Sequence, residues 1–373
     1  MHEPAYSVAP AAAEVVGAFF ARHSAEVSSL SIPDAATVAS IVDAAFWASL
    51  RQEEGRSPRI SLAFVAPAQA GHVITFAQPI PLAPESLTRL APAVERPGVH
   101  LGIWREGGGL LVWGATRTLP ELCLVLEVVE PGLLVLKYRR GPEFEKFGNI
   151  AVLRGDRLGV IDDRTAPPPD GSPLLQALLG LESVECPSDT GAVFVQLAVS
   201  MRGHGRGGLL LVVPSGTTTW RQSIVQPVGY AIGPAFSRLA ELLQQPKRDL
   251  RRTEVWEEVR RLIDVLAGLT AVDGAAIMTD HYDLLAFGAT VGRRDGHGAV
   301  ESVVVTEPLV GDVPSIVAPT QLGGTRHLAA AQFVHDQRDS LALVASQDGR
   351  FTVVAWSPSE GMVHAYRIEA LLF

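Results

Sequence analysis

A series of short apolar runs between residues 59 and 161 constrains the fold of this chain more than any other feature. Glycine, proline or charged pairs separate the runs. Such runs with turn residues between them are typical of neighbouring antiparallel β-strands. We therefore expect strands at residues 60–65, 73–76, 99–105, 109–116, 122–129, 132–139, 149–153 and 158–161.

Helices are expected ahead of this strand series. Residues 11–23 and 33–52 are rich in alanine and carry apolar residues at helical spacing. Ser31 and Asp34 are candidate caps for the second helix. A short helix at residues 84–93 would interrupt the strands.

The remainder of the chain alternates between the two kinds of element. Thr253 to Leu269 has the apolar face of an amphipathic helix. Further helices are expected at residues 174–181, 234–245 and 325–334, and strands at 192–201, 208–214, 274–278, 284–289, 300–305, 340–346, 351–356 and 363–368. The fold class is therefore α/β or α+β.

A break in the pattern at Pro246-Lys247-Arg248-Asp249 predicts a domain boundary. Residues 1–245 then form the first region, with residues 1–58 helical and 59–245 mostly β with short helices. Residues 250–373 form the second region. Two or three domains suit a chain of 373 residues.

Charge and hydropathy exclude some classes of protein. The net charge of −9 supplies no general basic field for a nucleic-acid backbone, so no nucleic-acid partner is expected. No run approaches the roughly 20 apolar residues of a membrane helix. No signal peptide is expected, because the N-terminal residues lack a basic segment followed by a long apolar run. We expect a cytoplasmic protein without a membrane partner. The two cysteines, Cys123 and Cys186, are expected to be buried thiols.

Asp273 lies at the entry to an apolar strand, followed by Gly274 and Ala275. A carboxylate fixed there, beside residues small enough for a ligand to come close, suits a metal ion or a ribose hydroxyl. The alternative is an aspartate that simply makes the turn before Gly274.

A second candidate is the segment Gly323-Gly324-Thr325-Arg326-His327 at the start of a predicted helix. A glycine pair exposes backbone N–H groups, and the helix dipole, a hydroxyl and a guanidinium add to the attraction for a phosphate. The alternative is a solvated helix cap. A third segment, residues 203–208, combines glycines with His204 and Arg206, and could hold an anion or serve as a flexible turn.

Together, in this order, three segments of residues 250–373 resemble the diadenylate cyclase (DAC) family. Val272-Asp273-Gly274-Ala275 resembles the family's DGA motif. Residues 322–331, LGGTRHLAAA, resemble its GTRHRAA segment, and residues 344–348 resemble its late strand, which ends in Ser-Glu-Glu. Less specifically, residues 1–245 resemble the sensor regions found ahead of some DAC domains, mainly through residues 207–214 and Trp220.

The resemblance implies a mixed β-sheet flanked by helices that holds one ATP. Two such domains meet face to face and join two ATP molecules into cyclic di-AMP, a bacterial second messenger, so a homodimer or higher homo-oligomer is expected. The resemblance also implies Mg²⁺ or Mn²⁺. Asp273 would hold the ribose 3′-hydroxyl and the metal, while Arg326 and His327 would contact phosphates. Further nucleotide contacts would come from Gly274, Ala275, Gly323, Gly324, Thr325 and Ser346.

Two positions depart from the family pattern. Leu328 replaces the second arginine of the RHR motif, and Gln347 replaces a glutamate. One lost charge-assisted contact costs about 1.5–3 kcal/mol. Arg338 or Arg350 could compensate. These departures leave a second interpretation open, in which the domain binds ATP or a cyclic nucleotide as a sensor without turnover.

Overall fold

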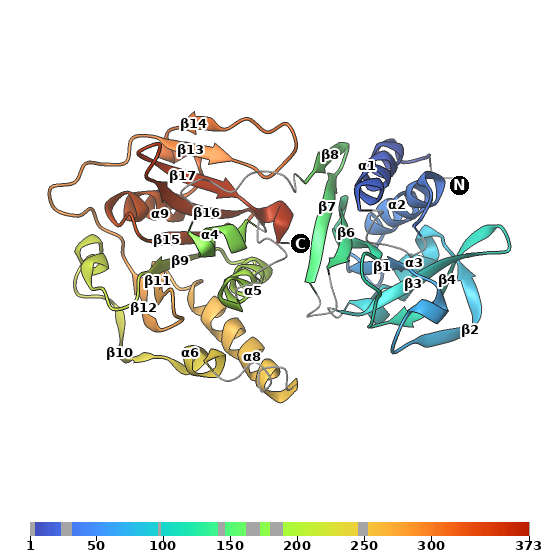
Figure 1. Ribbon diagram of the computed structural model, residues 1–373, viewed down its shortest axis with the longest axis horizontal. Helices are drawn as coiled ribbons and strands as arrows, with labels where there is room; N and C mark the ends of the chain where they lie inside the picture. Colours follow the sequence, from blue (N-terminus) through green and yellow to red (C-terminus); the bar gives the residue numbers. More distant parts are fainter. Residues whose placement is uncertain are drawn as a thin grey trace. The chain divides into compact units, whose positions relative to one another are not determined.

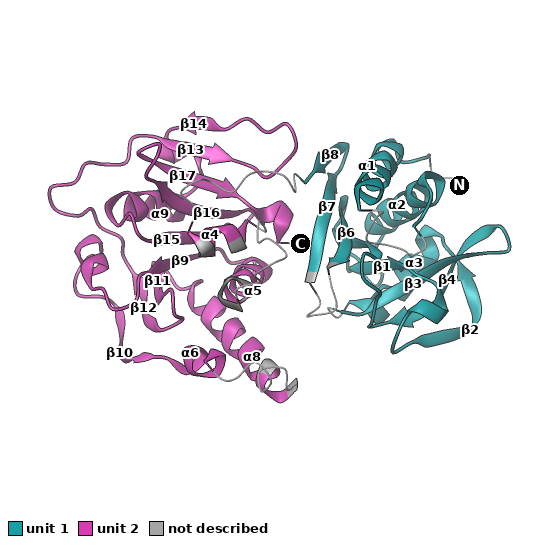
Figure 2. Cartoon of the chain, in the orientation of Figure 1, with its two compact units in different colours: residues 1–161, 373 teal, residues 162–372 magenta. Residues whose placement is uncertain are grey.

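The computed structural model describes residues 4–23, 32–95, 98–140, 146–161, 172–179, 189–244 and 253–372. The chain forms two compact units, residues 1–161 with 373 (unit 1) and residues 162–372 (unit 2), which are coloured separately in Figure 2. Each unit contains one mixed β-sheet with helices packed on it (Figure 1). The predicted α+β class is confirmed.

The described strands of unit 1 form a sheet in the order β2-β4-β3-β1-β5-β6-β7-β8. The strands are β1 (Ile60–Phe64), β2 (Ile74–Pro81), β3 (His100–Glu106), β4 (Gly109–Thr116), β5 (Leu124–Glu130), β6 (Leu133–Arg140), β7 (Lys146–Arg154) and β8 (Arg157–Val160). Neighbours are antiparallel except β1 and β3, which are parallel. A parallel pair needs a crossover, and the chain between these strands provides it with β2 and α3 (Pro84–Val94).

Three helices cover one face of this sheet: α1 (Ala9–Arg22), α2 (Ala35–Ser49) and α3. Strand alternation sends Leu124 and Leu126 of β5 into the core beneath these helices. Asp34 caps α2 as predicted, because its Oδ1 accepts the Thr37 N–H at 2.7 Å. Ser31, the other candidate cap, lies outside the described residues.

The opposite face of the unit 1 sheet buries polar side chains. Ser61 Oγ lies 2.7 Å from His100 Nδ1, and both residues are buried. Lys137 Nζ pairs with the Glu127 carboxylate and lies 5.9 Å from the centroid of the Phe147 ring. Burial lowers the pKa of His100 to about 4, opposed by the charge of Glu127. His100 is therefore neutral at physiological pH.

This histidine predicts acid sensitivity of unit 1. In the unfolded chain His100 takes up a proton near its ordinary pKa of 6.5, whereas the folded protein resists protonation until about pH 4. Protonation therefore favours the unfolded state between these values, so the stabilising contribution is complete above about pH 6.5 and is lost as the pH falls toward about 4. The free energy of unfolding of unit 1 is expected to fall by about 3 kcal/mol over this pH range. Denaturant unfolding of wild type and His100→Gln across this pH range measures it, and parallel pH profiles would contradict it.

The described strands of unit 2 form a second mixed sheet in the order β10-β12-β11-β9-β15-β16-β17-β13-β14. The strands are β9 (Gly208–Val213), β10 (Tyr230–Phe236), β11 (Ala275–Thr279), β12 (Leu284–Ala289), β13 (Val303–Thr306), β14 (Ser315–Val317), β15 (Leu341–Ala345), β16 (Phe351–Ser357) and β17 (Met362–Arg367). β9 lies between β11, to which it is parallel, and β15, to which it is antiparallel.

Helices pack on both faces of the unit 2 sheet. One face carries α4 (Pro173–Leu178), α5 (Asp189–Gly203), α6 (Arg238–Leu243) and α8 (Thr253–Leu269). The other face carries α9 (Thr325–Asp336) and the short 3-10 helix η3 (Thr219–Ser223). Because both faces are covered, β9, β11 and β15 are buried along their whole length.

Several sequence predictions need correction. Residues 192–201 are helical rather than a strand, since α5 turns Phe194, Leu197 and Met201 toward one core within an almost continuous apolar run. Residues 230–236 form β10, so the helix predicted at 234–245 shortens to α6. β14 was not predicted.

The division of the chain also differs from the prediction. Residues 246–249 lie outside the described residues, and the compact units divide between Ile161 and Asp162. The reason is that β9 pairs with both β11 and β15, so residues 208–213 are part of the same sheet as the carboxy-terminal strands. The predicted first region of residues 1–245 therefore contains residues 1–161 of unit 1 and the beginning of unit 2.

Candidate functional site

One edge of the unit 2 sheet brings the separated motifs together. Gly208 at the start of β9 pairs with Ala345 at the end of β15, and the parallel strand β11 starts at the same edge. The segments that reach this edge are residues 203–207, 271–274 and 346–350. The first turn of α9 joins them, since Arg326 lies against Gly207.

Arg326 is the centre of this arrangement. Its guanidinium is so close to the backbone of Gly207 that a Cβ added there would lie 2.8 Å from Nη1. The same Cβ would lie 3.3 Å from Cγ of Gln347. Arg326 Nε is buried and has no hydrogen-bond partner among the described residues. A buried donor without a partner is costly, so this position favours an anionic ligand.

The glycine-rich segment of residues 203–208 lies beside Arg326. The Arg206 N–H donates to His204 Nδ1 at 3.1 Å, and Gln347 Nε2 donates to the Arg206 carbonyl at 3.4 Å. The pKa of His204 is lowered, first by burial; the nearby Ala267 carbonyl opposes this, and the positive charges of Arg206 and Arg326 add to the lowering. The charges of both arginines therefore act on His204, and Arg206 directly precedes the glycine beside which Arg326 lies.

His327 lies under this group rather than on its surface. The residue is buried, its Nε2 lies 3.4 Å from Thr352 Oγ1, and a Cβ on Gly323 would lie 2.5 Å from its Nδ1. The pKa of His327 is lowered, first by burial and then by the charge of Arg367. The buried, neutral His327 ring is in van der Waals contact with Gly323 and holds the turn before α9. The prediction for His327 from the sequence was a direct contact with a phosphate.

Asp273 is exposed on the same edge of the sheet, with β9 between its strand and β15. Its Oδ1 accepts the Gly274 N–H at 3.1 Å. Gly274 has φ of +97°, and a Cβ there would meet the backbone of Gly288 and Ala289 within 3 Å, so the neighbouring strand requires this glycine. The exposed carboxylate fits the oxygen ligation that Mg²⁺ and Mn²⁺ prefer. Ala275 is buried.

The other predicted contacts divide into two groups. Gly323, Gly324 and Thr325 are exposed at the start of α9. Ser346 is half-buried, and its hydroxyl hydrogen-bonds to Asp348. Burial is the largest single influence on the pKa of the Asp348 carboxyl and raises it, but this hydrogen bond, the Arg350 N–H and the Arg350 charge together lower the pKa below its ordinary value. Ser346 is therefore already engaged inside the hairpin.

The two arginines proposed to replace the missing motif charge are also engaged. Arg350 pairs with Asp348 at 3.4 Å, and the guanidinium of Arg338 lies 4.1 Å from the centroid of the Trp356 ring. Arg206 is exposed, and it precedes Gly207, beside which the Arg326 guanidinium lies. Sequence reasoning noted Arg206 for its glycine-rich surroundings but could not connect it with residue 326.

Comparison with known proteins gives information mainly on unit 1. A family model described as "Probable sensor domain DACNV" matches residues 28–117. No curated protein matches this chain. A solved structure titled as that of a hypothetical membrane spanning protein from Bacillus cereus is 15% identical, with a TM-score of 0.29, over 52% of this chain and 71% of that one. Within the described part of the chain, no helix has the length and apolar character needed to cross a membrane. Unit 1 is thus similar to a sensor domain across α2, α3 and β1 to β4.

Proposed function

We propose that the protein is a diadenylate cyclase whose unit 2 holds ATP at the edge described above and whose unit 1 regulates it as a sensor. The environment of Arg326 carries the proposal. Its buried Nε has no partner among the described residues. Arg326 lies in the first turn of α9, and its guanidinium lies beside Gly207. Backbone N–H groups and the dipole at this helix end attract phosphate. The sensor match at residues 28–117 is consistent with a regulated enzyme.

Each residue of the edge then has a role. The phosphates are held by Arg326, the exposed Thr325 and the first N–H groups of α9. Arg206 supplies the positive charge that is missing at residue 328, where this chain has leucine instead of the motif's second arginine. Asp273 orients the ribose 3′-hydroxyl. A divalent cation, when bound, neutralises phosphate charge, and Asp273 would hold it. His327 positions the turn of Gly323.

The reaction needs two copies of the chain. Each 3′-hydroxyl oxygen bonds to the α-phosphorus of the other ATP, the bond from that phosphorus to its pyrophosphate breaks, and the hydroxyl proton leaves to solvent. Two pyrophosphates and one cyclic di-AMP result. One unit 2 offers one set of phosphate and ribose contacts, so the proposed active form is a homodimer in which two edges face each other, and catalysis rests on positioning.

The second candidate function is nucleotide binding without turnover. Gln347 favours it, because this residue stands where the family pattern has an acid and its amide donates to the Arg206 carbonyl. A site with that acid replaced and one arginine missing would still hold phosphates. Unit 2 would then be a nucleotide sensor.

Incubation of the full chain with ATP and Mn²⁺, followed by mass spectrometry, distinguishes the candidates. We expect cyclic di-AMP from the wild type and none above background from Asp273→Asn. ATP binding without product from the wild type would support the nucleotide sensor. Neither binding nor product would overturn both.

A further inference from the structure

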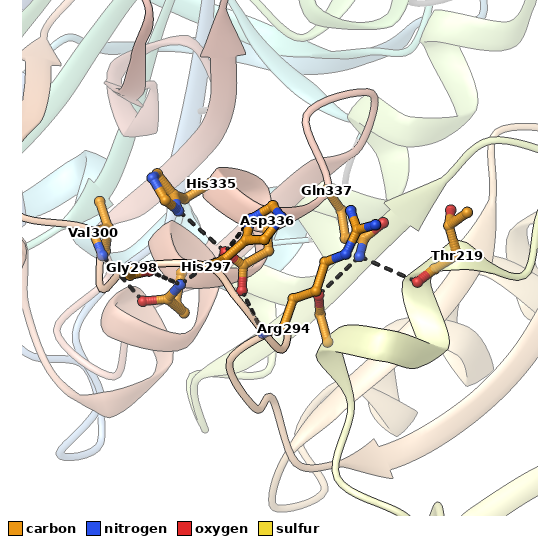
Figure 3. A network of polar contacts seen from close by, with 10 residues as sticks. Thr219, Arg294, His297, Gly298, Val300, His335, Asp336 and Gln337 are labelled. Atoms are coloured by element: carbon orange, nitrogen blue, oxygen red, sulfur yellow. Dashed lines mark hydrogen bonds and ion pairs between the residues drawn. The ribbon is translucent and has the colours of Figure 1, made fainter.

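Two histidines and an aspartate meet at the other end of α9. His335 and Asp336 are the last two residues of the helix, and His297 comes from the connection between β12 and β13 (Figure 3). One ligand atom from each of the three lies within 4.8 Å of the others. Asp336 Oδ1 is 3.1 Å from His335 Nδ1 and 3.4 Å from His297 Nδ1. The three side chains therefore converge on one point.

The negative charge of the Asp336 carboxylate favours a bound cation. The side chain of Asp336 is fully buried, and it lies at a helix carboxy-terminus, where the dipole is already negative. Its oxygens accept the backbone N–H of Arg294 at 2.9 Å and the amide of Gln332 at 3.0 Å. Among the described residues, no arginine or lysine side chain pairs with it. His335 Nδ1 is within hydrogen-bonding distance of Oδ1, and the two histidines neutralise the carboxylate only when they are protonated. A bound cation would supply the same positive charge to this buried carboxylate.

The distances suit a tetrahedral metal ion. Zinc bonds to imidazole nitrogen and carboxylate oxygen measure about 2.0–2.2 Å, which places neighbouring ligand atoms about 3.3–3.6 Å apart. The two separations at Asp336 Oδ1 lie within a few tenths of an ångström of that range. The bonds from Arg294 and Gln332 fix the orientation of the carboxylate, as the neighbours of metal ligands do.

We propose that His297, His335 and Asp336 bind a divalent cation of the zinc type through two imidazole nitrogens and one carboxylate oxygen. Water would complete the coordination, and of the three ligands His335 lines a cavity of about 220 Å³ together with Glu301 and Trp356. The ion joins the connection that carries His297 to α9. This connection is already held to the helix by Gln332, whose side chain accepts the Val300 N–H at 3.1 Å and donates to the Gly298 carbonyl at 3.2 Å. The proposal is independent of the nucleotide site at the opposite end of the helix.

The test is a titration of the metal-free full chain with Co²⁺ and Zn²⁺. We expect about one tightly bound ion per chain, tetrahedral d–d absorption bands with Co²⁺, and a higher Tm with Zn²⁺. His297→Ala, a change on a half-exposed loop residue, should abolish the bands and the Tm increase while leaving the metal-free Tm nearly unchanged. Gln332→Ala should weaken the affinity about 10- to 100-fold.

Two control variants locate the ion. His281→Ala changes an exposed histidine in the turn between β11 and β12, and Asp273→Asn changes the carboxylate of the nucleotide site. Both should bind Zn²⁺ as the wild type does. The proposal is overturned if the wild type shows neither bands nor a Tm increase, or if His297→Ala keeps both.

Discussion

Replacing Glu127 by leucine is expected to destabilise unit 1 by about 3–5 kcal/mol. The side chain of Lys137 is 4% exposed, and Glu127 is its anionic partner on the face of the sheet opposite the helices. Without the carboxylate, Lys137 must either remain charged without a partner or release its proton. Hydrogen–deuterium exchange of residues 124–140 measures the change for unit 1 separately from unit 2.

Two further variants show whether the cost comes from the unpaired charge. Glu127→Leu combined with Lys137→Met should recover most of the lost stability, because a buried ion pair replaced by apolar residues is often neutral. Glu258→Leu breaks the exposed ion pair with Arg238, whose atoms are 2.8 Å apart, and should cost at most about 1 kcal/mol. Equal losses from Glu127→Leu and Glu258→Leu would contradict this account.

The second large effect is expected from Gly207→Ala. A Cβ at residue 207 would lie 2.8 Å from Nη1 of Arg326, so the guanidinium must move away. If that guanidinium holds a phosphate, the loss of one charge-assisted contact weakens ATP binding by about 1.5–3 kcal/mol, which is roughly 10- to 100-fold in Kd. Isothermal titration with ATP measures the change.

Gly205→Ala is the matched control for this substitution. Gly205 and Gly207 both have positive φ, +65° and +72°, so alanine introduces similar backbone strain at either position. A Cβ on Gly205 meets nothing within 4 Å. Gly205→Ala should therefore introduce the backbone strain without the contact with Arg326, so it should lower stability no more than Gly207→Ala does and leave ATP affinity unchanged. A similar loss of affinity in both variants would show that strain, and not Arg326, is responsible.

The strands of unit 1 were predictable because the signals are local. Its apolar runs are separated by turn residues such as Gly155, which has φ of +58° in the predicted hairpin. The cap at Asp34 and the start of α9 at Thr325 depend on the same kind of local chemistry. Periodicity could not distinguish helix from strand in residues 192–201, because nearly every position there is apolar.

The pairing of distant segments could not be predicted in this way. Nothing in residues 203–208 indicates that β9 enters the sheet between β11 and β15, which brings Arg206 close to Arg326. The burial of His327 depends on its packing under Gly323 and beside Thr352. His297 and Asp336 are 39 residues apart in the chain, so only the tertiary fold shows that they meet.

The most direct test of the central claim, that unit 2 binds a nucleotide at the start of α9, is titration of the full chain with ATP and Mn²⁺. Wild type should be measured beside Arg326→Gln and Arg338→Gln, the latter removing an arginine that stacks on Trp356. We expect the wild type and Arg338→Gln to bind ATP with similar affinity and Arg326→Gln to bind it at least about 10-fold more weakly. A wild-type chain that does not bind ATP, or an Arg326→Gln variant that binds it equally well, would contradict the account.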